Sequence, residues 1–196
     1  KRVVGGQTKR YIEFFETLDF DSDDDAFFVD SGLTYDGAPA TVITGLDHLE
    51  GKEVDILADG AVHPPQTVSG GQITLESAAS KVHAGLKYTS TIETLRIEAG
   101  AVSGTAVGQV KRIDGVTLVL LDSMGVRVGP DEAALDVVPF RSTADPMDAA
   151  VPLFTGEKFV SFPGDVNTDT RIVVEQDLPL PLTILACAVH LKTNER

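Results

Sequence analysis

Glycine and proline recur along the whole chain and divide it into short apolar segments. There are 18 glycines and 10 prolines among 196 residues, and the segments between them are rich in Val, Ile, Thr and Phe. Short segments of this kind, bounded by turn residues, are typical of strands in a sandwich or barrel. No stretch keeps a clean helical period; only residues 131–135, after Pro130, offer a single helical turn. The sequence therefore predicts an all-β fold, an antiparallel β-sandwich combined with a small β-barrel-like module.

The chain is expected to form two structural parts. Residues 1–38 and 99–196 are predicted to make the sandwich, as a discontinuous domain, and residues 39–98 the small inserted β-barrel-like module. In the module, a strand at 53–58 ends in the turn pair Asp59-Gly60, and Gly70-Gly71 forms a second turn. Such turns need positive φ. Further strands of the module are expected at 72–76, 81–84 and 91–97.

The sandwich strands are expected on both sides of the module, at 9–16, 26–29, 111–122, 158–162, 171–176 and 182–191. The nearly unbroken apolar run 116–121 suggests a strand buried on both faces. Residues 101–108 are small and weakly patterned, so we interpret them as a linker or surface loop, and 137–147 as extended chain. Residues 178–181 (LPLP) cannot continue a ladder and are expected to form a bend between sheets.

Charge and cysteine content exclude several classes of function. The formal net charge is −14 and the basic residues are scattered, whereas gripping DNA or RNA requires clustered Lys and Arg. One cysteine, Cys187, cannot close an intramolecular disulfide, and we expect it to be buried as a small hydrophobe. No apolar run is long enough to span a bilayer and no signal peptide opens the chain. The chain begins with Lys1 rather than Met, so we expect an excised fragment.

The most conspicuous candidate for a site is the acidic run between residues 19 and 25. Asp19, Asp21 and Asp23 alternate, and Asp30 stands at the twelfth position of a calcium-type loop that starts at Asp19. However, Asp24 occupies the place where the sharp turn needs glycine, and flanking helices are not evident. A solvated acidic loop is the usual outcome for such a run, and no metal ligand is assigned.

The sequence also lacks the motifs of known catalytic and nucleotide-binding sites. The histidines have no metal-ligand spacing: His63, before two prolines, is expected in an exposed turn, and His83 and His190 at strand surfaces. A triad assembled in space remains an alternative, but Gly-x-Ser-x-Gly is absent. Paired carboxylates could support glycoside hydrolysis, but the chain has no Trp to form a sugar platform. We therefore predict a protein that is not an enzyme, with no catalytic, cofactor-binding or metal-binding residues.

Three groups of motifs follow one another along the chain. The first is 26–37 (AFFVDSGLTYDG). The second is 45–60 (GLDHLEGKEVDILADG), continued by 68–71 (VSGG) and 85–90 (GLKYTS). The third is 153–158 (LFTGEK), with 162–164 (FPG) and 176–182 (QDLPLPL). In order and spacing these motifs resemble the tail nozzle proteins (tail tubular protein B-like, also called stabilisation proteins) of short-tailed bacteriophages. Together they cover most of the chain from about residue 26 onward, whereas the first 25 residues match less distinctly.

The resemblance implies a function and a set of partners. It implies the C-terminal part of a longer subunit that forms a ring of identical copies, expected to be a homohexamer, below the portal and adaptor and near the tail fibre proteins. DNA would pass through the central channel without specific binding, the protein would be made in the host cytoplasm and reside in the virion tail, and no membrane would be involved. An acidic channel wall would let anionic DNA slide without sticking.

Two alternatives to the structural role remain open. One is a binding module at the tail tip, in which the loop at 163–169 recognises a host-surface glycan or a partner protein. The other is a hydrolase that uses paired carboxylates. We rank the structural role first, the binding module second and the hydrolase third.

Overall fold

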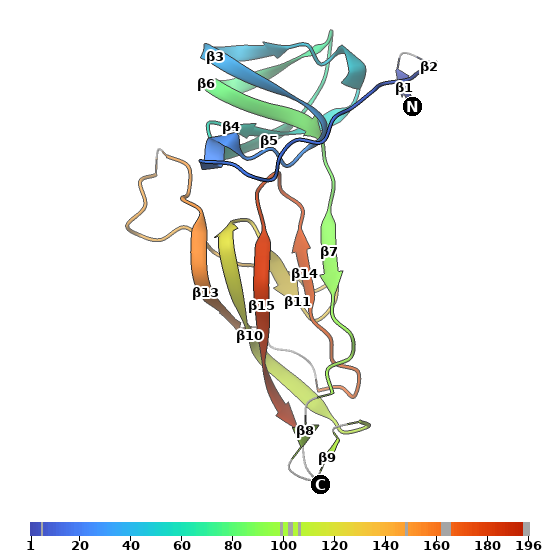
Figure 1. The fold of residues 1–196 in the computed structure, drawn as a ribbon, viewed down its shortest axis with the longest axis vertical. Coiled ribbons are helices and arrows are strands. Elements are labelled where there is room, and N and C mark those ends of the chain that lie inside the picture. Colours follow the sequence, from blue (N-terminus) through green and yellow to red (C-terminus); the bar gives the residue numbers. More distant parts are fainter. Residues whose placement is uncertain are drawn as a thin grey trace. The chain divides into compact units, whose positions relative to one another are not determined.

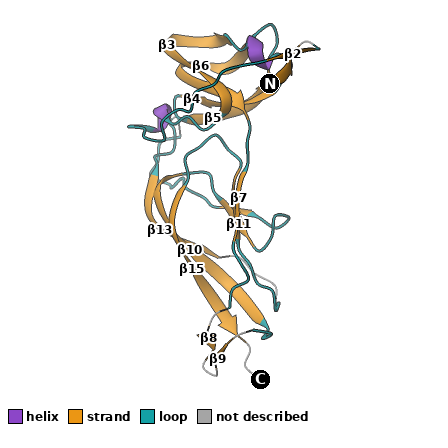
Figure 2. Cartoon of the chain, turned by 45° about the vertical axis from the view of Figure 1, so that its right-hand side comes forward, coloured by secondary structure: helices purple, strands orange, loops and turns teal. Residues whose placement is uncertain are grey.

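The computed structural model describes residues 1–4, 6–98, 100–101, 104–105, 107–147, 149–161 and 166–193. It confirms the all-β class, because the described residues contain only two short 3-10 helices, η1 (Asp23–Asp25) and η2 (Asp47–Leu49), among antiparallel strands (Figure 2). The strands are β1 (Arg2–Val4), β2 (Gln7–Lys9), β3 (Asp30–Thr44), β4 (Glu53–Ala58), β5 (Ala61–Thr67), β6 (Gln72–Leu86), β7 (Ser90–Glu93), β8 (Gly100–Ala101), β9 (Gly104–Thr105), β10 (Lys111–Ser123), β11 (Arg127–Gly129), β12 (Asp136–Val137), β13 (Phe154–Ser161), β14 (Val173–Gln176) and β15 (Thr183–Thr193).

The chain divides into two compact units. The first unit comprises Lys1–Tyr88, Arg141–Pro152 and Asp177–Pro181, and the second comprises Thr89–Phe140, Leu153–Gln176 and Leu182–Arg196. Strand pairing explains why this division differs from the expected one. Residues 30–38 lie in β3 and pair with β6 of the expected module. β7 instead pairs with β14 in the second unit, although it was expected in the module.

The first unit contains one four-stranded antiparallel sheet in the order β3-β6-β4-β5 (Figure 1). The expected turn at Asp59-Gly60 joins β4 to β5, with positive φ at both residues, +47° and +76°. Alternate side chains of β4 and β6 fill a core that includes Val54, Ile56 and Val82, all fully buried. In the described pairing β3 and β5 are the sheet edges, so the module is an open sheet rather than a closed barrel.

Several expected strands of the first unit change in extent. The separate strands expected at 72–76 and 81–84 are one strand, β6, whose register with β3 shifts between residues 36 and 42 of β3. Residues 26–29 precede β3 and are not a strand. Of the strand expected at 9–16, only Lys9 lies in a strand, β2, which pairs with β1. Residues 10–17 have no regular secondary structure, Leu18 lies in a bend, and residues 10–18 have no strand partner among the described residues.

The second unit is a sandwich of two sheets. A three-stranded sheet, β13-β10-β15, and a four-stranded sheet, β12-β11-β14-β7, contribute to one shared core. β10 is the central strand of the first sheet, and its side chains Val116, Leu118 and Leu120 are buried in that core. The expected burial of both faces of β10 is wrong, because Leu121 on the other face is 40% exposed. This alternation is the pattern of an antiparallel sheet with one face turned away from the core.

The remaining expectations for the second unit have mixed outcomes. The bend at 178–181 is confirmed, because it lies between β14 and β15, which belong to different sheets. Residues 131–135 form a turn, closed by the Ala134 N–H donating to the Asp131 carbonyl at 3.2 Å, and not a helix. Within the expected linker at 101–108, β8 and β9 pair as a short ladder, and residues 102, 103 and 106 lie outside the described residues. No helix among the described residues is long and apolar enough to cross a membrane.

The two cores predict that each unit has its own unfolding transition. All three tyrosines lie in the first unit and the chain has no Trp, so tyrosine fluorescence reports on that unit alone. Replacing the fully buried Leu118 by Ala should destabilise the second unit by about 2–5 kcal/mol, through lost burial and a new cavity. In urea titrations of this variant, the far-UV circular dichroism signal should begin to decrease at a lower urea concentration than in the wild type. The urea midpoint of the tyrosine transition should be unchanged.

The matched control is Ile56→Ala, which removes a fully buried side chain from the core of the first unit. This variant should shift the tyrosine transition to lower urea. Equal shifts of the tyrosine transition in both variants would contradict the assignment of two separate cores.

Candidate functional site

The acidic run makes contacts within the first unit and does not form a calcium loop. Residues 23–25 form η1, and the Ser22 hydroxyl lies within hydrogen-bonding reach of the carboxylates of Asp24 and Asp25. The Lys81 ammonium pairs with the Asp25 carboxylate, and this hydrogen bond lowers the pKa of Asp25 below its ordinary value. Among the described residues, no group of three or more Asp, Glu, His or Cys side chains is placed to hold a metal ion.

His83 was expected at a strand surface, but the structure buries it. Only 4% of the residue is exposed. Its Nε2 lies 2.8 Å from the Asp24 carbonyl and its Nδ1 2.9 Å from the Thr34 hydroxyl. Because a carbonyl only accepts hydrogen bonds, Nε2 carries the proton and Nδ1 accepts from Thr34. Burial lowers the pKa of His83 below its ordinary value, so the structure favours the neutral ring.

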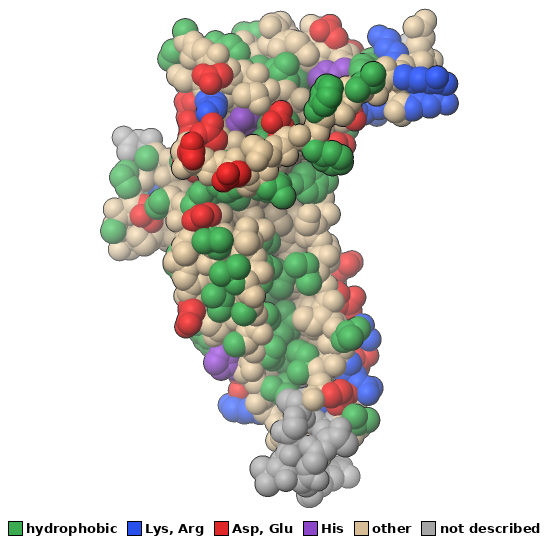
Figure 3. Space-filling model, in the orientation of Figure 1, with side chains coloured by type: hydrophobic (Ala, Val, Ile, Leu, Met, Phe, Trp, Pro, Cys, Tyr) green, Lys and Arg blue, Asp and Glu red, His purple; other side chains and the backbone are tan. Residues whose placement is uncertain are grey.

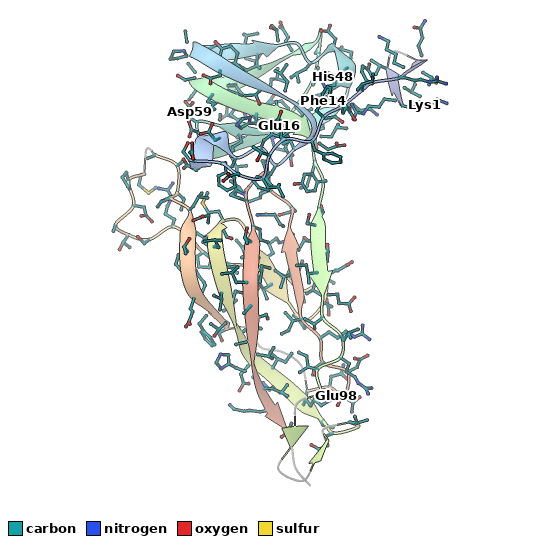
Figure 4. All side chains as sticks on the ribbon, in the orientation of Figure 1. Lys1, Phe14, Glu16, His48, Asp59 and Glu98 are labelled. Atoms are coloured by element: carbon teal, nitrogen blue, oxygen red, sulfur yellow. The ribbon has the colours of Figure 1, made fainter. Side chains whose placement is uncertain are left out.

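A cavity of about 500 Å³ lies beside His83. Its lining is dominated by carboxylates and includes one ammonium group: Glu16, Asp19, Asp21, Asp25, Asp36 and Lys81. Figure 4 labels Glu16 on the N-terminal segment that contributes to this lining. Both nitrogens of His83 already have hydrogen-bond partners. The histidine is therefore not available as a base or metal ligand in this cavity, and its role is to join η1 to β3 and β6.

A second cavity, of about 320 Å³, lies in the second unit and includes Asp131 and Asn167 in its lining. The Arg171 guanidinium lies between two carboxylates of this lining, 3.0 Å from Glu93 and 3.2 Å from Asp169. Its charge therefore offsets carboxylates that a hydrolase would use as acid and base. The Thr170 hydroxyl in the same lining is buried and has no hydrogen-bond partner among the described residues.

The loop expected at 163–169 adjoins this second cavity through Asn167 and Asp169. Residues 163–165 of that loop lie outside the described residues. The described part contributes to the structure: the backbones of Asn167 and Lys111 exchange hydrogen bonds of 2.8 and 2.9 Å. The Lys111 side chain is fully buried and its ammonium group lies 3.0 Å from the Glu98 carboxylate.

The other histidines make structural contacts. His48 in η2 lies within 2.7 Å of the Ser31 carbonyl. His63 is half-buried in β5 rather than exposed in a turn, and its Nε2 accepts from the Glu76 N–H at 3.0 Å. His190 is exposed on β15, as expected, and contacts the Phe159 ring edge-on, with ring centroids 5.2 Å apart.

Cys187 departs most clearly from expectation. The apolar run around it indicated burial, but the residue is exposed on β15. β15 is an edge strand of its sheet in the described pairing. Partial burial nevertheless raises the pKa of its thiol above the ordinary value. A raised pKa lowers the fraction of thiolate at neutral pH, which argues against a nucleophilic role.

The turn at Ser69-Gly70-Gly71 is confirmed, and it has a partner that sequence analysis did not identify. The Glu50 carboxylate accepts hydrogen bonds from the backbone N–H groups of Gly70 and Gly71 at 3.0 and 2.8 Å. These hydrogen bonds lower the pKa of Glu50. This carboxylate therefore fixes a turn that is far from it in sequence.

Two apolar surfaces lack cover in the structure, and sequence analysis did not identify them as sites. We define the N-terminal arm as residues 10–18. Four of its large apolar side chains are almost wholly exposed: Ile12, Phe14, Phe15 and Leu18. We define the β15 edge as residues 185–188 of β15, all of which are exposed and apolar. Apolar side chains gather over this sheet of the second unit in Figure 3. Groups of this kind typically mark interaction surfaces.

No family model matches the chain. No curated protein matches it either.

Burial of His83 predicts a loss of stability in mild acid. Its pKa is lowered in the folded protein, so the unfolded chain binds a proton first as the pH falls below about 6.5. The unfolding midpoint should therefore fall between pH 7.5 and pH 5.5, and the fall should be smaller in His83→Gln. The carboxylates with lowered pKa values, such as Asp25, titrate below this window. His190→Gln serves as the exposed control, and an equal fall in both variants would contradict this role of His83.

Asp55 in β4 predicts the opposite dependence on pH. The residue is 7% exposed, and burial raises the pKa of its carboxyl although Lys87 opposes the shift. Ionised Asp55 therefore costs stability above its folded-state pKa, and stability should rise as the pH falls through that value. Asp55→Asn should raise the thermal midpoint at pH 7, with a gain that shrinks towards pH 4. Asp136→Asn on the exposed strand β12 is the control; a lowered midpoint in Asp55→Asn would show that the carboxylate is stabilising.

Proposed function

We propose that this chain is a non-enzymatic structural protein that assembles through its strands, and that it forms part of the tail nozzle of a short-tailed bacteriophage. The observation that supports an assembly role most directly is the pair of uncovered apolar surfaces, the N-terminal arm and the β15 edge. A monomeric soluble protein rarely leaves such groups of side chains exposed to water.

The nozzle assignment rests on the resemblance of the motif groups at 26–37, 45–60 and 153–182. In this proposal the chain belongs to a longer subunit, which forms a ring with identical copies, expected to be six. The ring contacts the portal, the adaptor and tail fibre proteins in the virion, after synthesis in the host cytoplasm. The ring encloses the path by which DNA leaves the particle.

Charge supports passage of DNA rather than binding. The net charge is −14, and a channel wall of the same sign as DNA repels the phosphate backbone. Arginine and lysine side chains concentrate at one place on the visible face of the first unit, the N-terminal hairpin around Lys1 (Figures 3 and 4). In this proposal those residues serve contacts between proteins.

The proposal predicts rings and weak affinity for DNA. Electron microscopy of the full-length protein should show rings with an axial hole. Filter binding at low salt should show no retention of double-stranded DNA by the assembled protein, because few basic residues are available to displace counterions. Particles without an axial hole, or tight retention of DNA, would contradict the nozzle assignment.

A second candidate function is supported by the cavity of the second unit. The buried Thr170 hydroxyl has no hydrogen-bond partner among the residues that the structure describes, and Asn167 and Asp169 belong to the loop at 163–169. Hydroxyl, amide and carboxylate groups are those that bind the hydroxyls of a sugar. Glycan-array binding that is lost in Thr170→Val, and that survives in the surface variant Thr155→Val, would support a receptor-binding module instead of a purely structural role.

A further inference from the structure

The first residues of the N-terminal arm have the side-chain pattern of a strand, but the arm pairs with no strand among the described residues. None of the backbone groups of residues 11–18 makes a backbone hydrogen bond with another described residue. On one side of the arm, the Tyr11 ring packs edge-on against His48, and the Glu13 carboxylate accepts from the Ser31 hydroxyl at 2.8 Å. Ile12 and Phe14 alternate with these residues and are 90% and 89% exposed. Over residues 11–14 the contacting and exposed side chains alternate with the period of a β-strand, whereas Phe15 is exposed although it follows on the contacting side.

The β15 edge, in turn, is a strand with one unpaired side among the described residues. β15 pairs with β10 on one side only, and no described strand lies on its other side. Leu185 is 61% exposed, and Ala186, Cys187 and Ala188 are also exposed. Natural edge strands usually carry Lys, Pro or inward-pointing charges that prevent pairing. Here the stretch from Thr183 to Val189 carries no charge. Its pairing with β10 is regular except at Leu185, which is skipped between Ala186 and Ile184.

We propose that the N-terminal arm of one copy of this chain pairs with the β15 edge of a second copy. The lengths fit, because the eight residues 11–18 would span about 26 Å as a strand, and the eleven residues of β15 span about 36 Å. The area also fits. Phe14 and Phe15 together present roughly 300–500 Å², a large part of the approximately 800 Å² that each partner contributes to a stable interface.

Charge favours a second copy as the occupant. The arm follows the basic hairpin of β1 and β2, in which Lys1, Lys9 and Arg10 make no ion pair with another described residue. The chain as a whole carries a net charge of −14, so a second copy attracts the basic hairpin through its overall charge, while the stretch from Thr183 to Val189 that the arm would pair with is itself uncharged. A basic hairpin beside an apolar arm therefore matches an acidic partner with an open apolar strand.

The pairing is heterologous, because the arm lies in the first unit and the β15 edge in the second. An open oligomer therefore has a free arm at one end and a free β15 edge at the other. It either closes into a ring or grows into a filament. The strand pairing itself does not require the nozzle assignment; only its closure into a ring rests on the proposed function.

Cys187, the only cysteine of the chain, allows a direct test. One set of tagged chains carries Cys187→Ala together with a single cysteine at position 12, 13, 14 or 15. Each is mixed with the untagged wild-type chain and oxidised with copper phenanthroline at pH 9, which removes two electrons and two protons from a pair of thiols. Val62→Cys, on the exposed side of β5, is the matched control in the same Cys187→Ala background. Tyrosine fluorescence checks the fold of the first unit in each variant, and far-UV circular dichroism checks the strands of both units.

We expect disulfide-linked heterodimers whose yield alternates along the arm, with positions 12 and 14 differing at least fivefold from positions 13 and 15. Leu185→Lys in the wild-type partner should abolish the alternation, because it places a charge on the uncovered edge. The inference would be overturned by yields no higher than in the Val62→Cys control, or by equal yields at all four positions.

The outcomes separate this inference from the nozzle assignment. Rings in electron micrographs without alternating cross-links would overturn the strand pairing and leave the nozzle assignment standing. Alternating cross-links with filaments or open oligomers, and no rings, would support the strand pairing and contradict the nozzle.

Discussion

Backbone hydrogen bonding between strands is the interaction on which the rest of this structure depends. An extended segment that leaves water must pair its N–H and C=O groups with a neighbouring strand. Inside each unit this requirement is met by long central strands, β6 between β3 and β4 in the first and β10 between β13 and β15 in the second. Among the described residues, no strand pairs with the N-terminal arm or with the outer side of the β15 edge, and the exposed side chains of both are apolar. The proposed assembly follows from this contrast.

The sequence predicted local structure well wherever a turn or a strand is determined by its own residues. β4 has the predicted bounds, and the Asp59-Gly60 turn has the positive φ values that its residues favour. The bend at 178–181 lies between sheets, as two prolines dictate. β10 also begins at the predicted residue and ends one residue later than predicted.

The failures concern partners that are distant in sequence. The strand-forming tendency of residues 9–16 was recognised, but whether a strand finds a ladder depends on which edges the fold leaves open. His83 is buried because η1, nearly sixty residues earlier, supplies the Asp24 carbonyl. Cys187 lies in an apolar run yet is exposed, because β15 is an edge strand. The boundary between the units lies after Tyr88 because of strand pairing as well. β3 pairs with β6 in the first unit, whereas β7 pairs with β14 in the second.

The carboxylates of the chain illustrate how local charges acquire structural roles. Asp25 pairs with Lys81, and Glu50 holds the turn at Gly70-Gly71. Glu98 compensates the buried ammonium of Lys111. An uncompensated buried charge would be costly, so these contacts stabilise the fold rather than assemble a reactive centre.

Hydrogen–deuterium exchange measured over a range of protein concentrations tests the central claim most directly. If the arm and the β15 edge pair between copies, amides in the peptides covering 11–18 and 183–193 gain protection together as the concentration rises, while β4 stays equally protected throughout. Protection of both peptides that is independent of concentration, or a gain in only one of them, would contradict the account.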